Sequence, residues 1–368
     1  MKMTRGLLAG CAMALALGAG LTGAHADTMS DAKAFLAKYS AHVTTWDGPT
    51  TGPKAATGKS IVVLAGDMKN GGILGVTNGF TEAAKVIGWK VRVIDGAGTV
   101  SGRTSAFAQA LALKPDGIVI EGFDPIEQKP GLQAADQAHI PIVAWHAGAK
   151  LGPIPGTSVR VNVSTDPMLV SKAAALWAYI DAKGHPAVVI FTDGQYQIAV
   201  AKALEMKKII LAMGGKVLAY EDTPIADTSS RMPQLTTSLL QKFGAKWTDS
   251  LAINDIYYDF MGPSLSDAGI DGEGNPKAVA AGDGSKSAYE RIRSGQYQAV
   301  TVAEPLNLQG WQLVDELNRA FAGQTWSGYV APFHVVTKAN IAFDGGPQNT
   351  FDPDNGYRDH YKAIWGVQ

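Results

Sequence analysis

The sequence predicts an α/β protein with two doubly wound parallel-sheet lobes, and three observations support this class. The chain has 368 residues, which is long for one hydrophobic core and fits two domains of ordinary size. Short apolar runs that end in polar residues alternate with segments of helical periodicity, the pattern of parallel sheets covered by helices. These runs are too many for one sheet, so we place the break between the two sheets near residues 164–167.

The expected strands follow one another along each half of the chain. The first half contains IVVLAGD, KVRVID, GIVIEGFD, IPIVAWH and VRVNVSTD, and the second contains AVVIFTDG, KVLAYED, SLAIND, AVAAGDG and AVTVAEP. Segments such as NGFTEAAKVIG and TSAFAQALAL lie between them and have the periodicity of amphipathic helices. Each half therefore has the strands and crossover helices of its own sheet.

Residues 1–26 have the features of a secretory signal peptide. Basic Lys2 and Arg5 precede an apolar run over residues 6–21, and the sequence AHAD gives the small-x-small pattern of a cleavage site before Asp27. We therefore expect a mature protein that begins at Asp27 and resides in the periplasm.

Cys11 leaves one alternative for the N-terminus. It follows Leu-Ala-Gly and could be the lipidated residue of a lipoprotein, although the apolar run continues beyond it. It is also the only cysteine, so the mature chain would have no disulfide and no cysteine-based metal site. Residues 27–58 read as an extension that holds a short helix, SDAKAFLAKYSAHV, and then a turn-rich stretch.

Charge and motif spacing argue against nucleic-acid and nucleotide binding. The net charge is −1, so no basic face recommends nucleic acid. Gly58, Lys59 and Ser60 resemble the end of a phosphate loop, but they precede a strand instead of following one. The glycines of VRVIDGAGTVSG approach a dinucleotide fingerprint with the third glycine one residue late. We expect no cofactor.

An enzyme is not indicated either. No Gly-x-Ser-x-Gly elbow is present, and the seven histidines show no pair at metal-ligand spacing on one helix. We therefore expect neither catalytic residues nor a metal ion.

Polar residues collect where the expected strands end. In open parallel sheets, ligands bind beyond the carboxyl ends of the strands at a topological switch point. Each of these side chains could instead cap the next helix, because Asp and Asn accept hydrogen bonds from free amide groups. The strand-end set is Asp67, Asn70, Asp124, Trp145, His146, Asp193, Asn254, Asp255, Asp283 and Glu304.

From about residue 59 to residue 338 the chain resembles the periplasmic solute-binding proteins of ABC importers, in the ribose- and galactose-binding group with the type I periplasmic binding protein fold. The most specific pieces are LAIND, the block AAGDGSKSAYERIRSGQYQAVTVAEPLNLQGWQLVDEL, and the early GVTNGFTEAAKVIGWKVRVID. In this family the Gly-x-Asp-Gly sequence precedes a helix, a turn, a strand that ends at a ligand-facing polar residue, and a returning helix.

The resemblance implies two lobes joined by a three-segment hinge, with the ligand cleft between them. Residues 59–164 and 305–331 would form the N-terminal lobe, and residues 165–304 and 332–368 the C-terminal lobe. It also implies a monomer that is not an enzyme, and that closes on a small solute and delivers it to an ABC permease in the inner membrane.

The resemblance also implies a set of ligand-binding residues. This chain departs from its sugar-binding relatives where they have an aromatic pair, because it has Gly71 and Gly72 there. Aromatic stacking would then come from Phe123, Trp145, Tyr196, Tyr257 or Trp311. The implied ligand-binding residues are Asn70, Asp124, Trp145, His146, Lys202, Asp227, Asn254, Asp283 and Glu304.

This residue set favours a polyhydroxylated ligand such as a sugar or sugar alcohol, because it mixes acceptors, donors and an apolar face. An amine-bearing solute is the alternative, since carboxylates outnumber cations. Presentation of the ligand to a chemoreceptor or sensor kinase is a further alternative, whereas a DNA-binding regulator does not fit an export signal. Within LAIND, we expect Asn254 to face the cleft and Asp255 to cap the helix that holds Tyr257 and Tyr258.

Overall fold

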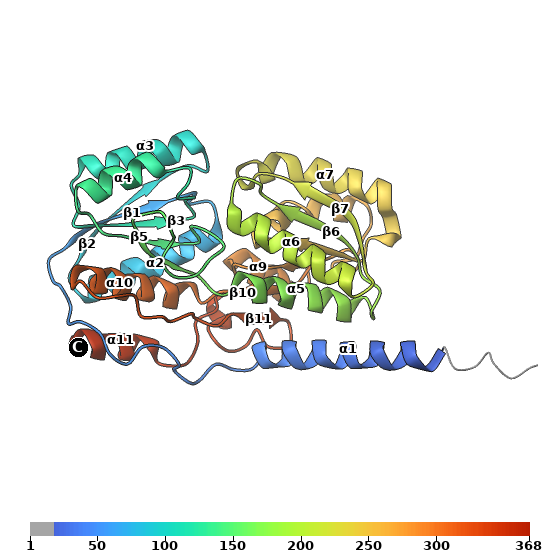
Figure 1. Ribbon diagram of the computed structural model, residues 1–368. Coiled ribbons are helices and arrows are strands. Elements are labelled where there is room, and N and C mark those ends of the chain that lie inside the picture. The colour runs from blue at the N-terminus through green and yellow to red at the C-terminus, as the bar shows by residue number, and fades with distance from the viewer. Residues whose placement is uncertain (1–17) are drawn as a thin grey trace, which may run out of the picture.

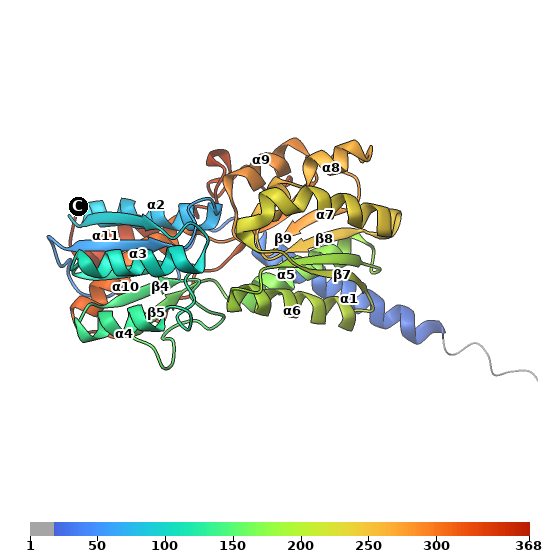
Figure 2. The ribbon, with the colours of Figure 1, turned by 90° about the horizontal axis from the view of Figure 1, so that it is seen from above.

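The computed structural model describes the backbone of residues 18–368 and the side chains of residues 28–368. The predicted signal-peptide features at Lys2, Arg5 and Cys11 lie outside the described residues. Figures 1 and 2 show two lobes side by side, each built around its own sheet. The predicted fold class is confirmed.

The N-terminal lobe has a parallel sheet in the order β2-β1-β3-β4-β5. The central strands β1 and β3 are almost entirely apolar and buried, because helices cover both faces of the sheet. The order reverses between β1 and β3, which makes their carboxyl ends a topological switch point. The strands are β1 (Ser60–Ala65), β2 (Lys90–Asp95), β3 (Gly117–Glu121), β4 (Ile142–Trp145) and β5 (Val159–Val163).

Two helices cover each face of this sheet. On one face, α2 (Gly71–Val86) packs against α10 (Leu306–Phe321), and on the other α3 (Val100–Ala112) packs against α4 (Lys129–Gln137). The chain between β1 and α2 turns at Asn70, whose side chain accepts a hydrogen bond from the Gly72 amide.

The C-terminal lobe repeats this arrangement. Its sheet has the order β11-β10-β9-β8-β6-β7, with β11 antiparallel at the edge and the other strands parallel. Here the switch point lies between β6 and β8. The strands are β6 (Ala187–Thr192), β7 (Lys216–Asp222), β8 (Asp249–Ala252), β9 (Lys277–Ala280), β10 (Gln298–Ala303) and β11 (His334–Thr337).

The helices of the C-terminal lobe follow its strands as crossovers. The short 3₁₀ helix η3 (Asp255–Asp259) directly follows β8. The helices are α5 (Pro167–Asp181), α6 (Gln197–Ala212), α7 (Thr228–Phe243), α8 (Gly262–Asp267) and α9 (Lys286–Ser294). Among the described residues, no helix is both long enough and apolar enough to cross a membrane.

The chain passes between the lobes at the three places that the resemblance implies. These are the step from β5 to α5 near Ser164, the step from β10 to α10 at Pro305, and the segment between α10 and β11 that contains Ala331. Strand β10 belongs to the C-terminal sheet, whereas α10 packs on α2 of the N-terminal lobe.

A fourth crossing corrects the expected lobe boundary. The resemblance implies that residues 332–368 belong to the C-terminal lobe, but α11 (Tyr357–Trp365) packs on α10 in the core of the N-terminal lobe. The reason is an aromatic stripe, because Tyr357, Tyr361 and Trp365 surround Trp311, and the two indole rings stack with centroids 5.5 Å apart.

The N-terminal extension makes a fifth connection between the lobes, which we call the strap (residues 28–58). The predicted helix over residues 30–43 is helical only to Tyr39, as part of α1 (Gly18–Tyr39), which packs on α5 and β11 of the C-terminal lobe. Farther along, the Ala56 amide donates to Asn318 Oδ1 of α10 at 2.9 Å, and the Ala55 amide donates to the Trp365 carbonyl at 3.0 Å. One continuous segment is therefore bound to both lobes.

Candidate functional site

The carboxyl ends of both sheets face one another, and a small buried pocket lies between them. We call it the inner pocket. Its volume is about 50 Å³. It lies at the switch points of both lobes, beyond β1 and β3 on one side and beyond β6 and β8 on the other. Its polar lining comprises Asp67, Asn70, Trp145, His146, Tyr196, Lys202, Asn254 and Asp283, and its apolar lining comprises Ile73, Ala199, Ile198, Ile225 and Ile253.

Lys202 and Asp283 form the charged centre of this pocket. Lys202 Nζ lies 3.9 Å from Asp283 Oδ1, and both side chains are almost fully buried. Within the described part of the chain, the Lys202 ammonium and the Asp283 carboxylate contact each other in this ion pair. Neither group has a hydrogen bond to another described residue. Burial raises the pKa of Asp283 to about 6, against the opposing charge of Lys202. The Lys202 ammonium can therefore still donate hydrogen bonds, and the Asp283 carboxylate can still accept them, on the side that lines the pocket.

Two asparagines add further donors from opposite lobes. Asn70 Oδ1 accepts from the Gly72 amide at 2.9 Å, and Asn254 Oδ1 accepts from the Ile256 amide at 3.3 Å. Each asparagine is therefore a helix cap as well as a pocket residue. In the described chain neither side-chain nitrogen has a protein partner, and both residues are less than 10% exposed.

A buried network at the second hinge crossing fixes the orientation of Trp145 and His146. His146 Nε2 lies 3.1 Å from Glu304 Oε2, and Gln309 Nε2 donates to the same oxygen at 3.0 Å. Trp145 Nε1 donates to Gln309 Oε1 at 2.8 Å, and its ring stacks on His146 with centroids 3.6 Å apart. Burial opposes ionisation of Glu304, but His146 and Lys202 lower its pKa to about 2. The network therefore holds a charged carboxylate at the hinge.

One group in this region has the composition of a metal site. Ligand atoms of His146, Asp283 and Glu304 lie within 4.8 Å of one another. Both carboxylates already have partners, since Glu304 contacts His146 and Gln309, and Asp283 pairs with Lys202. A cation would also meet the buried ammonium of Lys202, so we retain the prediction that this protein needs no metal ion.

Three of the nine expected ligand residues, Asp124, Asp227 and Glu304, do not line the inner pocket, and Glu304 instead contacts His146 in the hinge network. Asp227 is exposed at the start of α7, away from the pocket lining. Asp124 lines a small neighbouring cavity together with His146 and Tyr196, and its Oδ1 accepts from the Ile126 amide at 2.8 Å. Of the candidate stacking rings, Trp145 and Tyr196 line the inner pocket, whereas Phe123, Tyr257 and Trp311 are buried in the cores of the lobes.

The expectation for Asp255 is wrong. It does not cap η3, because the Asn254 side chain does so. Asp255 is buried, and its Oδ2 accepts from the Gly284 and Ser285 amides at 2.8 and 3.0 Å, while Gln298 donates to its Oδ1 at 2.6 Å. It thus anchors the loop that carries Asp283. The hydroxyls of Tyr257 and Tyr258 donate to backbone carbonyls of the core.

Sequence reasoning missed Arg103, which contacts Tyr196, a residue of the inner pocket, from the other lobe. The residue is on α3, is fully buried, and donates to Glu127 through Nε at 2.9 Å and Nη2 at 2.6 Å. Its Nη1 donates to the Tyr196 hydroxyl of the other lobe at 3.0 Å. Arg103 lies within a helix and not at a strand end, so the strand-end pattern gave no signal for it.

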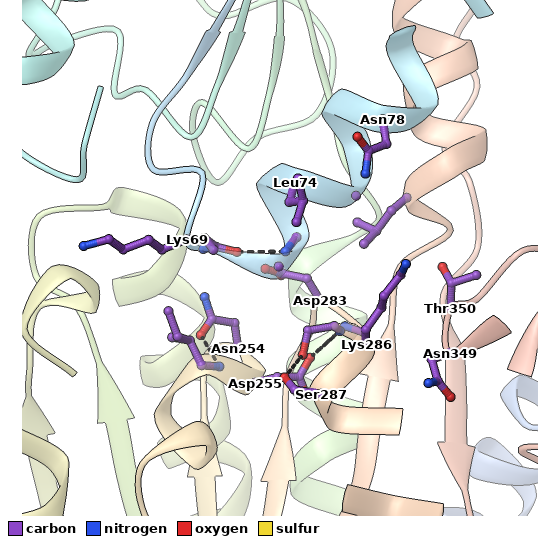
Figure 3. Close-up of a pocket in the computed structure, with 18 of the residues that line it drawn as sticks. Lys69, Leu74, Asn78, Asn254, Asp255, Asp283, Lys286, Ser287, Asn349 and Thr350 are labelled. Carbon is purple, nitrogen blue, oxygen red and sulfur yellow. Dashed lines mark hydrogen bonds between the residues drawn. The ribbon is translucent and has the colours of Figure 1, made fainter. Parts of the chain in front are cut away.

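A larger cavity lies beside the inner pocket, and we call it the outer cavity (Figure 3). Its volume is about 470 Å³. It shares three lining residues with the inner pocket, namely Asn70, Asn254 and Asp283. Its walls come from the start of α2, from η3, from the loop before α9, from the start of α10 and from residues 348–350.

Comparisons with known proteins agree on the architecture. A family model described as "Periplasmic binding protein domain" matches residues 61–325. None of the curated proteins matches the chain.

Similar solved structures include an ABC sugar transporter subunit from Rhodobacter sphaeroides 2.4.1, with 19% identity, a TM-score of 0.66, and coverage of 77% of this chain and 99% of that one. A solute-binding protein from Agrobacterium vitis, bound with alpha-D-tagatopyranose, has 17% identity, a TM-score of 0.70, and coverage of 80% and 99%. Another from Agrobacterium vitis, with bound allitol, has 19% identity, a TM-score of 0.66, and coverage of 79% and 98%. At these identities the likeness shows the fold.

Proposed function

The chain belongs to the periplasmic binding protein family, and from this premise we propose that it is the substrate-binding component of an ABC importer for a small polyhydroxylated solute. The solute would bind between the lobes and be delivered to a permease in the inner membrane. The chain would act by binding alone, without breaking a bond.

The observation that carries this proposal is unused hydrogen-bond capacity from both lobes around one buried pocket. Asn70 and Asn254 offer side-chain nitrogens, Lys202 offers its ammonium, and Asp283 offers carboxylate oxygens. Buried polar groups normally make hydrogen bonds, and these four side chains keep unused hydrogen-bond capacity beyond the ion pair of Lys202 and Asp283, so the set points to a ligand. A hydroxyl both donates and accepts, and so it can satisfy an amide or ammonium and a carboxylate at once.

The same contacts favour a polyol over an amine-bearing solute. An ammonium would need carboxylates that are free to receive it. The charge of Asp283 is already balanced by Lys202, and the Glu304 carboxylate already contacts His146 and Gln309. The ligands named for two of the similar structures, alpha-D-tagatopyranose and allitol, are a sugar and a sugar alcohol, in keeping with this choice.

Closure of the lobes would be the mechanism. The inner pocket of about 50 Å³ is far below the roughly 300 Å³ at the lower end of ligand pockets, so this conformation is contracted. A solute that contacts Asn70 on one lobe and Asn254 on the other favours the closed over the open form by its differential affinity. The hinge network at Glu304 lies where such a motion would pivot.

A thermal-shift screen of the mature protein tests the proposal. Pentoses, hexoses, alditols, inositols and amino sugars should include at least one neutral polyol that raises Tm, because a ligand that binds only the folded state stabilises it. NAD(H) is the negative control. If only amino sugars or other cations raise Tm, the solute class is wrong, and a response to NAD(H) alone would contradict the binding-protein proposal.

The export route has its own test. We propose a mature N-terminus at Asp27, which terminal sequencing of the protein from a periplasmic fraction would check. A diacylglyceryl group on Cys11 would contradict it.

A further inference from the structure

The outer cavity is continuous with the proposed polyol site through shared side chains. Asn70, Asn254 and Asp283 line both spaces, so a ligand held by these residues has direct access to the larger one. The volume of about 470 Å³ lies within the range of small-molecule sites, roughly 300 to 1,000 Å³. A solute that ends at the inner pocket would leave this space unused.

The positive ends of three helices meet at this cavity. Residues at the first turns of α2, α9 and α10 line it, and these helices have 16, 9 and 16 residues. The amino end of a helix carries a partial positive charge and favours an anion. Asn254 gives a second indication, because it is only 5% exposed, lines this cavity, and has a side-chain nitrogen without a hydrogen-bond partner in the described chain that in Figure 3 is directed towards α2.

The acidic side chains that line the outer cavity have protein partners, whereas its lysines have none in the part of the chain that the structure describes. Each of the three carboxylates already has partners: Asp255 accepts from two amides and from Gln298, Asp259 pairs with Arg291, and Asp283 pairs with Lys202. In contrast, Lys69 and Lys286 also line the cavity and have no ion pair within the described residues. Figure 3 shows Lys286 extending along the cavity between α2 and Thr350. The unmatched charge is therefore positive.

We propose that the outer cavity is a second subsite that binds an anionic substituent of the ligand, such as a carboxylate or a phosphate, with Lys286 as its main cationic contact. This inference rests on the proposed function and narrows it. The substrate class becomes sugar acids or sugar phosphates, with the hydroxylated part at Asn70, Asn254 and Asp283. The amides of Asn78 and Asn307 lie on the same walls and supply uncharged donors.

Matched pairs of probes test the subsite. Isothermal titration would compare D-galactose with D-galacturonate, D-glucitol with D-gluconate, and D-ribose with D-ribose 5-phosphate. In at least one pair the anion should bind about tenfold or more tightly than its neutral partner, as expected for one charge-assisted contact. Lys286→Gln should remove this preference and leave neutral binding within about twofold, because only the anion uses that contact.

Lys246→Gln is the control, because it makes the same charge change at an exposed position outside the cavity. Raising the ionic strength should weaken anion binding in the wild type and in Lys246→Gln, and should weaken it less in Lys286→Gln. The subsite is disproved if neutral members bind as tightly as the anions, or if Lys286→Gln behaves like Lys246→Gln; the proposed function then still stands. If no polyol, neutral or anionic, binds at all, the proposed function itself fails.

Discussion

The guanidinium of Arg103 donates a hydrogen bond of 3.0 Å to the hydroxyl of Tyr196, and this bond joins the two lobes at the edge of the inner pocket. The guanidinium carbon also lies 5.3 Å from the centre of the Tyr196 ring. Glu127 holds Arg103 in place through two further bonds. We call the pair Arg103 and Tyr196 the latch. Because its two residues belong to different lobes, the bond requires that the lobes be in contact here.

Tyr196→Phe should therefore weaken ligand binding while preserving the ring that lines the pocket. Loss of a hydrogen bond to a charged donor costs about 1.5–3 kcal/mol, so we expect roughly a tenfold or greater rise in Kd, mainly through faster dissociation. Stopped-flow kinetics with the polyol found in the screen would measure it. Tyr297→Phe is the matched control, because its hydroxyl donates to the Ile270 carbonyl within the C-terminal lobe. Equal effects of the two substitutions would refute the latch.

Asn254 and its neighbour Asp255 should respond differently to truncation. Asn254→Ala and Asp283→Ala each remove groups that face the inner pocket, so each should raise Kd about ten- to a hundredfold. Asp255→Ala strands three buried donors and should lower the free energy of unfolding by about 3 kcal/mol or more. Calorimetric titration and urea melts separate the two outcomes. Normal binding by both Asn254→Ala and Asp283→Ala would contradict their assignment to the site.

Glu121 gives the fold a measurable pH dependence. Burial raises the pKa of this residue to about 8, although the Thr77 hydroxyl donates to it. The folded protein therefore keeps a proton that the unfolded chain releases, and stability should fall as pH rises from about 4.5 to 8. The contribution is on the order of 5 kcal/mol, and Glu121→Gln should abolish it. Urea melts at pH 5.5 and 8.5 would measure the loss of unfolding free energy between the two pH values, which should be smaller in Glu121→Gln than in the wild type. An equal loss in both proteins would rule out this role of Glu121.

Trp46 attaches the strap to the N-terminal lobe, because its ring contacts Tyr329, His360 and Tyr361 at centroid distances of 5.3–5.4 Å. Trp46→Ala should free this part of the strap while α1 stays bound to the C-terminal lobe. We expect faster amide exchange over residues 40–58 and a larger radius of gyration without ligand, since one connection between the lobes is loosened. Unchanged scattering would mean that the strap does not limit opening.

The sequence contained most of the architecture because apolar runs and helical periodicity report burial directly. Each expected strand is present, and their polar ends converge as the switch-point rule requires. Asp227 is expected in the site only by correspondence with relatives, and the structure instead places it at the exposed start of α7. The sequence pattern could not reveal the true role of Asp255, because strand alternation ends where η3 begins and its partners lie on the distant loop at Asp283.

The sequence could not predict the contacts of α11 and Arg103, for a different reason. An aromatic stripe such as Tyr357, Tyr361 and Trp365 indicates that a helix is buried, but not against which lobe. Arg103 likewise shows a charge on a helix, and only the tertiary structure reveals Tyr196 opposite it.

The placement of α11 has a consequence for the order in which the protein can fold. The core of the N-terminal lobe uses residues from Ile61 to Trp365, so a ribosome must make nearly the whole described chain before that core is complete. Domains usually fold as units during synthesis, but here the first lobe to be started cannot finish early. The N-terminal lobe cannot complete its core until α11 has been made, so its apolar surface stays exposed through nearly the whole of synthesis.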